Sequence, residues 1–366
     1  MLLLYILGSI SVVLILLDTL AWILLQRDKT KVFFVERPLV SILVAVRNEE
    51  NSIMACLQAL ENLTYPKEKL EILLGNDQST DNTAALIEEF IAQKPYFKLF
   101  HIEKTCGNAI GKANVLAQLA RKARGEWLFF TDADTCVPND WVQNMLALGE
   151  NRDVITGFTW VQGKNLWATL QALDWTFALA VAKIFSDFRL PVTAMGNNMA
   201  VRRSAYDQTG GYENLPATLT EDFALLKAIT TQKGTFKNLF SASVLAETQA
   251  SPLFSDLLKQ RKRWMRGALQ ARWYAQAYVG VRVGFYIILV LFAVTKSHFW
   301  QEILIFWGAK VLWQSVFLHK CLVILGKKIA WLNYLLFELY AMILSWLLPF
   351  YYILPFKIDW KGRLFN

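Results

Sequence analysis

Two aspartates separated by a single residue stand where a metal ion could bind. Asp132 and Asp134 flank Ala133 and follow an apolar run that ends at Phe130. In an extended backbone alternate side chains share one face, so both carboxylates can point into the same cleft. Carboxylate oxygens suit Mg2+ or Mn2+, which usually complete their shell with water and phosphate oxygens. The motif predicts a metal and phosphate site, with a plain acidic surface turn as the alternative.

Two further acidic motifs could serve a reaction at a hydroxyl group. Asp77 ends another apolar run, and its carboxylate could accept hydrogen bonds from a nucleotide base or ribose. Glu221 and Asp222 stand at the start of an expected helix that runs to about Lys233. Turn formation and capping by Thr220 are the structural alternatives. An attacking hydroxyl must lose a proton, so we expect Asp222, rather than Glu221, to be the general base.

A basic and aromatic segment, expected to form a helix from about Ser255 to Tyr278, carries the fourth motif. Gln260, Arg263 and Trp264 lie within it. Arginine is a good clamp for a diphosphate, and an indole offers a flat face to a sugar ring. The same composition is typical of a helix at a membrane surface, where basic residues meet lipid phosphates. Both interpretations can hold for one helix.

The sequence pattern predicts alternating strands and helices, which must position these residues. Near-continuous apolar runs are each bounded by polar turns, which is typical of strands buried on both faces of a parallel sheet. Repeated strand and helix units predict a doubly wound α/β domain. Ligands bind such sheets at the carboxyl ends of the strands, where the acids stand. The expected strands are Leu39–Val46, Glu71–Asp77, Phe97–Ile102 and Glu126–Asp132.

The ends of the chain are apolar enough for a membrane. The 366 residues are 55% hydrophobic, with a mean hydropathy of +0.30, which is high for a soluble enzyme. Of the apolar stretches after Arg282, the first, Val283 to Val294, is short for a span. We therefore divide the chain into an anchor (1–26), an α/β domain (35–250), an interfacial helix (251–280), about three membrane segments (281–356) and a tail (357–366).

Basic residues indicate the orientation of the domain. Arg27, Lys29 and Lys31 follow the first apolar segment. Lysine and arginine beside a span tend to stay in the cytosol, so we expect an integral membrane protein with a cytosolic domain, which in a bacterium would lie in the inner (plasma) membrane. A cleavable signal peptide is disfavoured, because no basic run precedes the apolar stretch and no small-residue cleavage pattern follows it.

Composition excludes several function classes. The net charge of +8 collects at membrane flanks and within residues 259–272, with no nucleic-acid motif beside it, so lipid head groups and a diphosphate are the expected anionic partners. The four cysteines lack metal-ligand or redox spacing and are expected to be free thiols. The three histidines are scattered, which leaves no histidine metal site or serine-histidine triad.

Taken in order, these motifs resemble those of the family 2 glycosyltransferases. The resemblance is to the membrane-integrated branch, which includes cellulose and hyaluronan synthases and bacterial glycolipid glycosyltransferases, and it covers about Pro38 to Trp273. It implies a GT-A fold, a nucleotide-sugar donor and an inverting reaction in which the acceptor oxygen displaces the nucleoside diphosphate directly. By this resemblance the donor nucleotide would be bound by Asp77, Asp132, Lys112 and Arg263. Asp134 would bind Mg2+ or Mn2+, and Asp222 would be the base. The diphosphate and the acceptor would be surrounded by Glu221, Gln260, Trp264 and Asn197.

A membrane lipid is the expected acceptor, and two alternatives stay open. A processive polysaccharide synthase would need a polar channel, because unpaired sugar hydroxyls are costly in hydrocarbon, and about four apolar segments make a poor channel wall. A noncatalytic nucleotide-binding scaffold would need neither Asp222 nor the motif around Arg263. A transporter subunit is disfavoured because no polar pairs mark the apolar segments as a pathway. The polar exceptions in these segments are Asp18, Glu302, Lys310, Gln314, His319 and Glu338.

Overall fold

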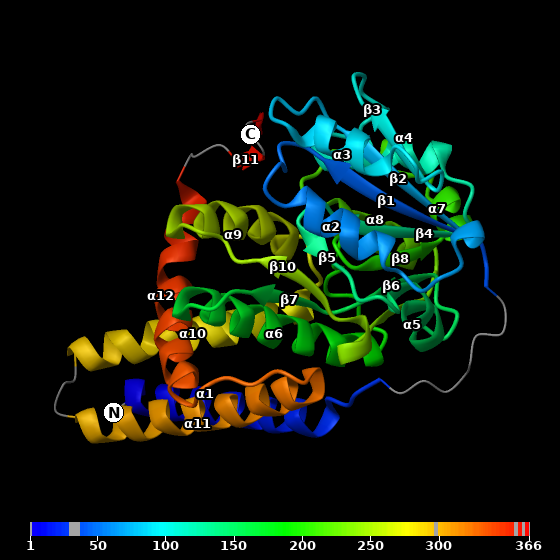
Figure 1. Ribbon diagram of the computed structural model, residues 1–366. Helices are drawn as coiled ribbons and strands as arrows, with labels where there is room; N and C mark the ends of the chain where they lie inside the picture. The colour runs from blue at the N-terminus through cyan, green and yellow to red at the C-terminus, as the bar shows by residue number, and fades with distance from the viewer. Residues whose placement is uncertain (1, 29–36, 296–298, 355–357, 361–362, 366) are drawn as a thin grey trace. The chain divides into compact units, whose positions relative to one another are not determined.

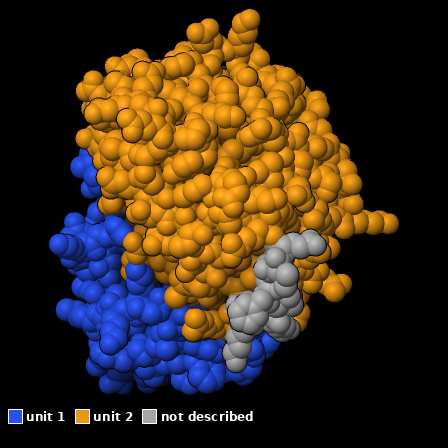
Figure 2. All heavy atoms as spheres, turned by 45° about the vertical axis from the view of Figure 1, so that its right-hand side comes forward, with its two compact units in different colours: residues 1–26, 161–184, 250–358 blue, residues 27–160, 185–249, 359–366 orange. Residues whose placement is uncertain are grey.

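The computed structural model divides the chain into two compact units, which are coloured separately in Figure 2 and described here one at a time. It describes all residues except 1, 29–36, 296–298, 355–357, 361–362 and 366. Unit 1 comprises residues 1–26, 161–184 and 250–358, and unit 2 comprises residues 27–160, 185–249 and 359–366. Lys29 and Lys31, on which the predicted orientation partly rests, lie outside the described residues.

Unit 2 is built on a seven-stranded mixed sheet with the strand order β3-β2-β1-β4-β8-β6-β9 (Figure 1). Its first four strands are parallel, and β8 runs antiparallel to both β4 and β6. The bounds are β1 (Val40–Val46), β2 (Leu70–Asn76), β3 (Phe97–His101), β4 (Trp127–Asp132), β6 (Val154–Thr156), β8 (Met199–Arg202) and β9 (Phe236–Asn238). The expected α/β fold is confirmed, and the four predicted strands are β1 to β4.

Smaller sheets and short helices complete the set of elements. A second sheet has the order β5-β10-β7, and a third pairs β11 with β12. Their bounds are β5 (Thr135–Cys136), β7 (Thr159–Gln162), β10 (Ala246–Gln249), β11 (Ile358–Trp360) and β12 (Arg363–Phe365). The helices of unit 2 are α2 (Ile53–Glu61), α3 (Thr83–Ile91), α4 (Gly111–Lys122), α5 (Trp141–Leu148), α7 (Arg203–Gln208), α8 (Glu221–Thr231) and the short helices η1 (Lys67–Lys69), η2 (Tyr212–Asn214) and η3 (Ala242–Val244).

Helices cover both faces of this sheet, which explains why its strands are apolar throughout. Ile42 and Val44 of β1 belong to a buried cluster that includes residues of α2, α3 and α5. On the opposite face α4 packs against β2 so closely that a Cβ at Gly75 would lie 2.3 Å from Cγ1 of Val115. Burial on both sides removes the polar alternation of an exposed sheet. The sheet edge that carries the acids is therefore supported by two helical layers.

Unit 1 is helical. Its helices are α1 (Leu2–Leu24), α6 (Leu166–Asp187, in this unit up to Ile184), α9 (Phe254–Leu269), α10 (Trp273–Thr295), α11 (Trp300–Leu325) and α12 (Leu332–Ile353). Four of them, α1, α10, α11 and α12, are long and apolar enough to cross a membrane. These four helices agree with the predicted apolar segment at the amino-terminal end and the three predicted near the carboxyl end. They make the chain compatible with membrane integration.

Two details of the expected membrane elements are wrong. The apolar stretch that starts at Val283 is not a short segment, because it is the second half of the 23-residue helix α10. The basic segment expected as one helix from Ser255 to Tyr278 is divided, since α9 ends at Leu269 and α10 begins at Trp273. Leu269 and Trp273, on either side of this break, are both exposed.

The apolar helices contain buried ion pairs, so the expectation that no polar pairs occur there is wrong. Asp18 of α1 pairs with Arg282 of α10, and Nζ of Lys310 of α11 lies 2.5 Å from Oε2 of Glu338 of α12. Gln314 also donates to Glu338 at 3.0 Å. Each charge is opposed by its partner and enclosed by helices, which is typical of helix association rather than of an exposed pathway.

Candidate active site

The acids of the first two motifs meet at one edge of the unit 2 sheet. In the parallel register Ala45 of β1 lies opposite Asp132, and Val46 lies opposite Asn76, so β1, β2 and β4 end almost level. Asp77 directly follows β2, and its backbone N–H donates to the carbonyl of Val46 at 2.8 Å. Asp77 and Asp132 therefore lie on either side of the end of β1, as the carboxyl-end rule predicts.

The expected extended backbone ends at Asp132, because Ala133 and Asp134 form a turn between β4 and β5. Asp132 and Asp134 are partly exposed, whereas Ala133 between them is buried. The Thr135 hydroxyl lies 3.2 Å from Oδ1 of Asp134, to which it donates. Among the described residues no three ligand-type side chains converge on one point. Mg2+ and Mn2+ in phosphate sites are usually held by one or two carboxylates together with phosphate oxygens and water, so Asp134 fits such an ion as its protein ligand.

Lys112, at the start of α4, links two of the acidic motifs. Its Nζ lies 2.5 Å from Oδ1 of Asp132 and 3.1 Å from Oε1 of Glu221. Burial by itself lowers the pKa of this amine, but the two carboxylates outweigh burial and raise the pKa above its ordinary value. Lys112 therefore stays charged and holds a strand end and a helix start together.

Asp222, the second residue of α8, is fixed by the backbone. Its Oδ2 accepts a hydrogen bond from the N–H of Gly196 at 2.9 Å, and its Oδ1 accepts one from its neighbour Phe223 at 2.7 Å. A Cβ at Gly196 would lie 3.0 Å from the Asp222 side chain, so a larger residue here would require Asp222 or the loop to shift. The side chain of Thr220 makes no capping bond to α8, so the expected capping alternative is not observed.

Burial and neighbouring charges together set the pKa of Asp222. Burial, followed by the neighbouring carboxylate of Glu221, raises the pKa of Asp222 from 3.8 to about 6, although Lys112 and the two backbone N–H groups act in the opposite direction. A carboxylate with a pKa near 6 is mostly ionised at neutral pH and still binds a proton well. This is the property that a general base requires.

The loop before β8 holds the Gly196 N–H in place. Oδ1 of Asn197 accepts from the Thr159 hydroxyl at 2.9 Å, and its backbone carbonyl accepts from the Thr131 hydroxyl at 3.0 Å. The next residue, Asn198, accepts from the indole N–H of Trp141 at 2.8 Å. Asn197 is buried, so its observed contacts are with the protein, and its predicted place beside the acceptor stays a prediction.

The motif on α9 belongs to unit 1. Gln260, Arg263 and Trp264 are half-buried. Arg261 and Lys262, which lie between them and are not part of the motif, are buried. Nη2 of Arg261 lies 2.5 Å from Oδ2 of Asp174 in α6, and its guanidinium lies 4.4 Å from the centre of the Trp264 ring. The structure thus gathers Asp77, Lys112, Asp132, Asp134, Asn197, Glu221 and Asp222 in unit 2, whereas Gln260, Arg263 and Trp264 lie in unit 1.

Comparison with known proteins decides the family. The family model described as glycosyl transferase family 21 matches residues 2–366. The chain belongs to glycosyl transferase family 21. This is a family of the family 2 type, so the predicted resemblance is confirmed and the chain is a glycosyltransferase.

Relatives with assigned names are also glycosyltransferases. Over 241 residues the family 21 chain is 31% identical to the beta-monoglucosyldiacylglycerol synthase of Nostoc sp. strain PCC 7120, an alignment that covers 64% of this chain and 49% of that protein. It is 26% identical over 239 residues to the poly-beta-1,6-N-acetyl-D-glucosamine synthase of Staphylococcus epidermidis, covering 62% of this chain and 54% of that one. The chain spans about half the length of the curated relatives it matches.

A solved structure shows the same fold. The mannosyltransferase PcManGT of Pyrobaculum calidifontis, solved with GDP-Man and Mn2+, superimposes with a TM-score of 0.60 and 17% identity, over 93% of this chain and 99% of that chain. The expected GT-A fold is confirmed by this likeness.

Proposed function

We propose that this chain transfers a sugar from a nucleotide-sugar donor to a hydroxyl group of a membrane lipid, in a metal-dependent reaction with inversion at the anomeric carbon. The observation that carries the proposal is Asp222, a half-buried carboxylate with a pKa of about 6 held by two backbone N–H groups, in the unit whose sheet edge carries Asp77 and Asp132. The nucleotide-sugar and Mn2+ bound to PcManGT, which shares the fold, support the donor and metal assignments.

In the proposed reaction Asp222 accepts the proton of the acceptor hydroxyl as its oxygen attacks the anomeric carbon. The bond from that carbon to the diphosphate oxygen breaks, and the nucleoside diphosphate leaves with the bonding electrons. Attack opposite the leaving group inverts the configuration and needs no covalent enzyme intermediate. A bound Mg2+ or Mn2+, with Asp134 as its protein ligand, would neutralise charge on the departing diphosphate.

The remaining contacts proposed for the donor nucleotide involve residues of the other sequence motifs. Asp77 and Asp132 lie where hydrogen bonds to base and ribose are expected at the carboxyl ends of strands. Lys112 supplies a fixed positive charge between Asp132 and Glu221, where it can face a phosphate. The roles of Gln260, Arg263 and Trp264 around the diphosphate and acceptor stay predictions from the family resemblance.

A lipid acceptor is favoured by the apolar helices and by the relatives. A lipid can reach an enzyme from the bilayer surface, whereas a growing polysaccharide must cross the hydrocarbon in a polar channel. In the four apolar helices Asp18 pairs with Arg282 and Lys310 pairs with Glu338, which leaves these charged residues unsuited to line such a channel. The name of the Nostoc relative, a glucosyldiacylglycerol synthase, points to the same acceptor class. A cytosolic domain would have access to nucleotide sugars.

The test is product analysis with the purified full chain. The protein is incubated with Mg2+ or Mn2+, candidate UDP- and GDP-sugars and membrane lipid extract, and the products are separated by solvent extraction and mass spectrometry. We expect a solvent-extractable glycolipid and stoichiometric nucleoside diphosphate. A high-molecular-weight, glycosidase-sensitive polymer would replace the lipid acceptor by a processive reaction. Absence of nucleoside diphosphate release with every donor would favour the noncatalytic scaffold.

A further inference from the structure

One face of α6 in unit 1 holds the beginning of α9 and carries residues outside the sequence motifs. Trp167, Gln171 and Asp174 follow one another at helical spacing, so they lie on the same face of α6. The indole N–H of Trp167 donates to the carbonyl of Ser251 at 2.7 Å. Gln171 exchanges two hydrogen bonds with the backbone of Ser251, at 3.0 and 3.1 Å. The chain that leads into α9 is therefore fixed to α6 by uncharged groups.

Asp174 extends this attachment into α9 itself. Its Oδ2 lies 2.5 Å from Nη2 of Arg261. Arg261 is 8% exposed, so its charge is largely removed from water and is opposed by the Asp174 carboxylate. The guanidinium is rigid and planar, so a bond at Nη2 restricts its plane as well as its position.

The guanidinium of Arg261 in turn lies against Trp264, one turn further along α9. It is 4.4 Å from the centre of the indole, which is within the range of a cation–π contact. Trp175, the neighbour of Asp174, contacts the same indole with 5.0 Å between ring centres. Two adjacent residues of α6 thus act on Trp264, Trp175 directly and Asp174 through Arg261.

These contacts restrict the orientation of the indole. Trp264 is half-buried, so part of its side chain stays accessible. A tryptophan side chain has several staggered rotamers, and each directs the ring differently. Without the Asp174 charge the buried guanidinium would lose its counter-charge, which favours its turning towards solvent. Trp264 would then lose one of the two groups that hold it.

We propose that Asp174 is a positioning residue, which orients Trp264 through Arg261 for contact with the acceptor. The inference rests on the proposed function, in which Trp264 lies beside the acceptor, and it adds a residue of α6 that no motif includes. The charge of Asp174 is not needed to dock α9 on α6, because Trp167, Gln171 and Trp175 make their contacts without it. The ion pair therefore adds orientation to an attachment that other groups already provide.

Asp174→Asn tests the inference because it keeps the size of the side chain and removes its charge. The purified full chain is assayed with Mn2+ and membrane lipid extract in detergent micelles, using whichever of UDP-glucose, UDP-galactose, UDP-N-acetylglucosamine and GDP-mannose gives product with the wild type. We expect kcat/KM for the lipid to fall by about five- to tenfold. Equilibrium affinity for UDP and GDP should stay unchanged.

Two conservative variants separate charge from shape. Arg261→Lys keeps the positive charge and loses the planar group, so it should lower kcat/KM to the same extent as Asp174→Asn. Asp174→Glu keeps the negative charge, and the Asp174 side chain is 32% exposed, which leaves room for the longer residue. This variant should stay within about twofold of the wild type.

A double-mutant cycle with Trp264→Ala shows whether Asp174 acts through the indole. Trp264→Ala by itself should lower kcat/KM for the lipid. In that background Asp174→Asn should change kcat/KM by less than about twofold, because the group that it positions is absent. A residue that only supports the fold would reduce kcat/KM by the same factor in both backgrounds.

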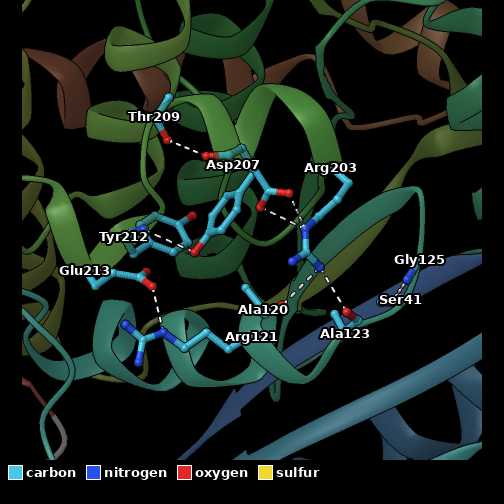
Figure 3. A network of polar contacts seen from close by, with 11 residues as sticks. Ser41, Ala120, Arg121, Ala123, Gly125, Arg203, Asp207, Thr209, Tyr212 and Glu213 are labelled. Carbon is cyan, nitrogen blue, oxygen red and sulfur yellow. Dashed lines mark hydrogen bonds and ion pairs between the residues drawn. The ribbon is translucent and has the colours of Figure 1, made fainter.

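The pair of Arg203 and Asp207 in unit 2 provides a matched control. Nε of Arg203 lies 2.8 and 2.9 Å from the two carboxylate oxygens of Asp207. Figure 3 shows this pair, with the same guanidinium also donating to the carbonyls of Ala120 and Ala123. Asp207→Asn removes a carboxylate from an arginine that contacts no motif residue in this view, and it should keep wild-type kcat/KM.

Four results would overturn the inference. They are an unchanged kcat/KM in Asp174→Asn, an unchanged kcat/KM in Trp264→Ala, equal factors in the two backgrounds of the cycle, and an equal fall in affinity for UDP or GDP. The last would show that the pair supports α9 as a whole. Absence of product from the wild type with all four donors would instead overturn the proposed function, and with it this inference.

Discussion

Glu221→Gln should move the acid limb of the pH profile to lower pH. The side chain keeps its size and loses its charge, and the Glu221 carboxylate is the second cause, after burial, that raises the pKa of Asp222 to about 6. A base acts only when deprotonated, so wild-type kcat/KM should fall as the pH drops through about 6. Removing a negative neighbour makes ionisation of Asp222 easier, and the fall should occur at lower pH.

The size of the shift follows from the distance between two adjacent acids. For unit charges roughly 7 Å apart at an effective dielectric constant of about 20 to 40, Coulomb's law gives about 1.2 to 2.4 kcal/mol, which is about one to two pKa units. Lys112→Met is the matched variant of opposite sign, because Lys112 lowers the pKa of Asp222. Its acid limb should move to higher pH.

The assay is the pH dependence of kcat/KM for nucleoside diphosphate release between pH 4.5 and 8, which reports groups of the free enzyme. Opposite displacements of the two variants would support Asp222 as the titrating base. Displacement of both limbs in the same direction, or identical limbs in both variants and the wild type, would refute the electrostatic reasoning, since it would show that another group controls the profile.

Three further predictions concern the base, the metal and the membrane helices. Asp222→Asn should lower kcat by roughly a hundredfold or more while equilibrium binding of the donor survives, and loss of donor binding would show a structural role instead. Excess chelator should abolish turnover, and added Mn2+ or Mg2+ should restore it in the wild type but poorly in Asp134→Asn, whereas full activity in chelator would exclude metal dependence. Lys310→Met should destabilise the detergent-solubilised protein by about 3 to 5 kcal/mol by leaving the buried charge of Glu338 without its cationic partner. The double variant Lys310→Met with Glu338→Met should recover most of that loss in thermal unfolding, and equal loss in both would contradict pairing.

The topological prediction completes the set. A reporter fused after Lys31 should be cytosolic, because basic residues beside a span tend to remain on that side. The measurement is accessibility to protease or thiol reagent in oriented vesicles, with a reporter on the opposite end of the first apolar segment as the control. Protection of the site after Lys31 from the cytosolic side would contradict the orientation and would separate the domain from cytosolic nucleotide sugars.

Strands and helices of the α/β domain were predictable because their signals are local. The apolar run of β1 ends at Val46, where polar residues begin, and β2 and β4 end at the polar residues Asn76 and Asp132. Parallel strands end at a common edge, so the positions of Asp77 and Asp132 followed from their places after such runs. The antiparallel course of β8, which makes the sheet mixed, has no comparable local signal.

The ends of the membrane helices were less predictable for a related reason. Hydropathy locates the apolar centre of a span but not the polar turns that extend its helix, so α10 was expected to begin ten residues too late, at Val283 rather than Trp273. Pairs such as Asp18 and Arg282, 264 residues apart, leave no periodic pattern in either segment. Their partnership depends on helix packing alone.

By itself the sequence determined the family, the α/β class, the order of the acidic motifs and the apolar helices, because each depends on residue types at short spacing. Only the tertiary structure decided which groups meet: Lys112 with both Asp132 and Glu221, and Asp222 with the N–H of Gly196, 26 residues away. These contacts join segments that the chain brings together only when the sheet and its helices pack. The pKa of Asp222 depends on the same packing, since burial and neighbouring charges exist only in the folded protein.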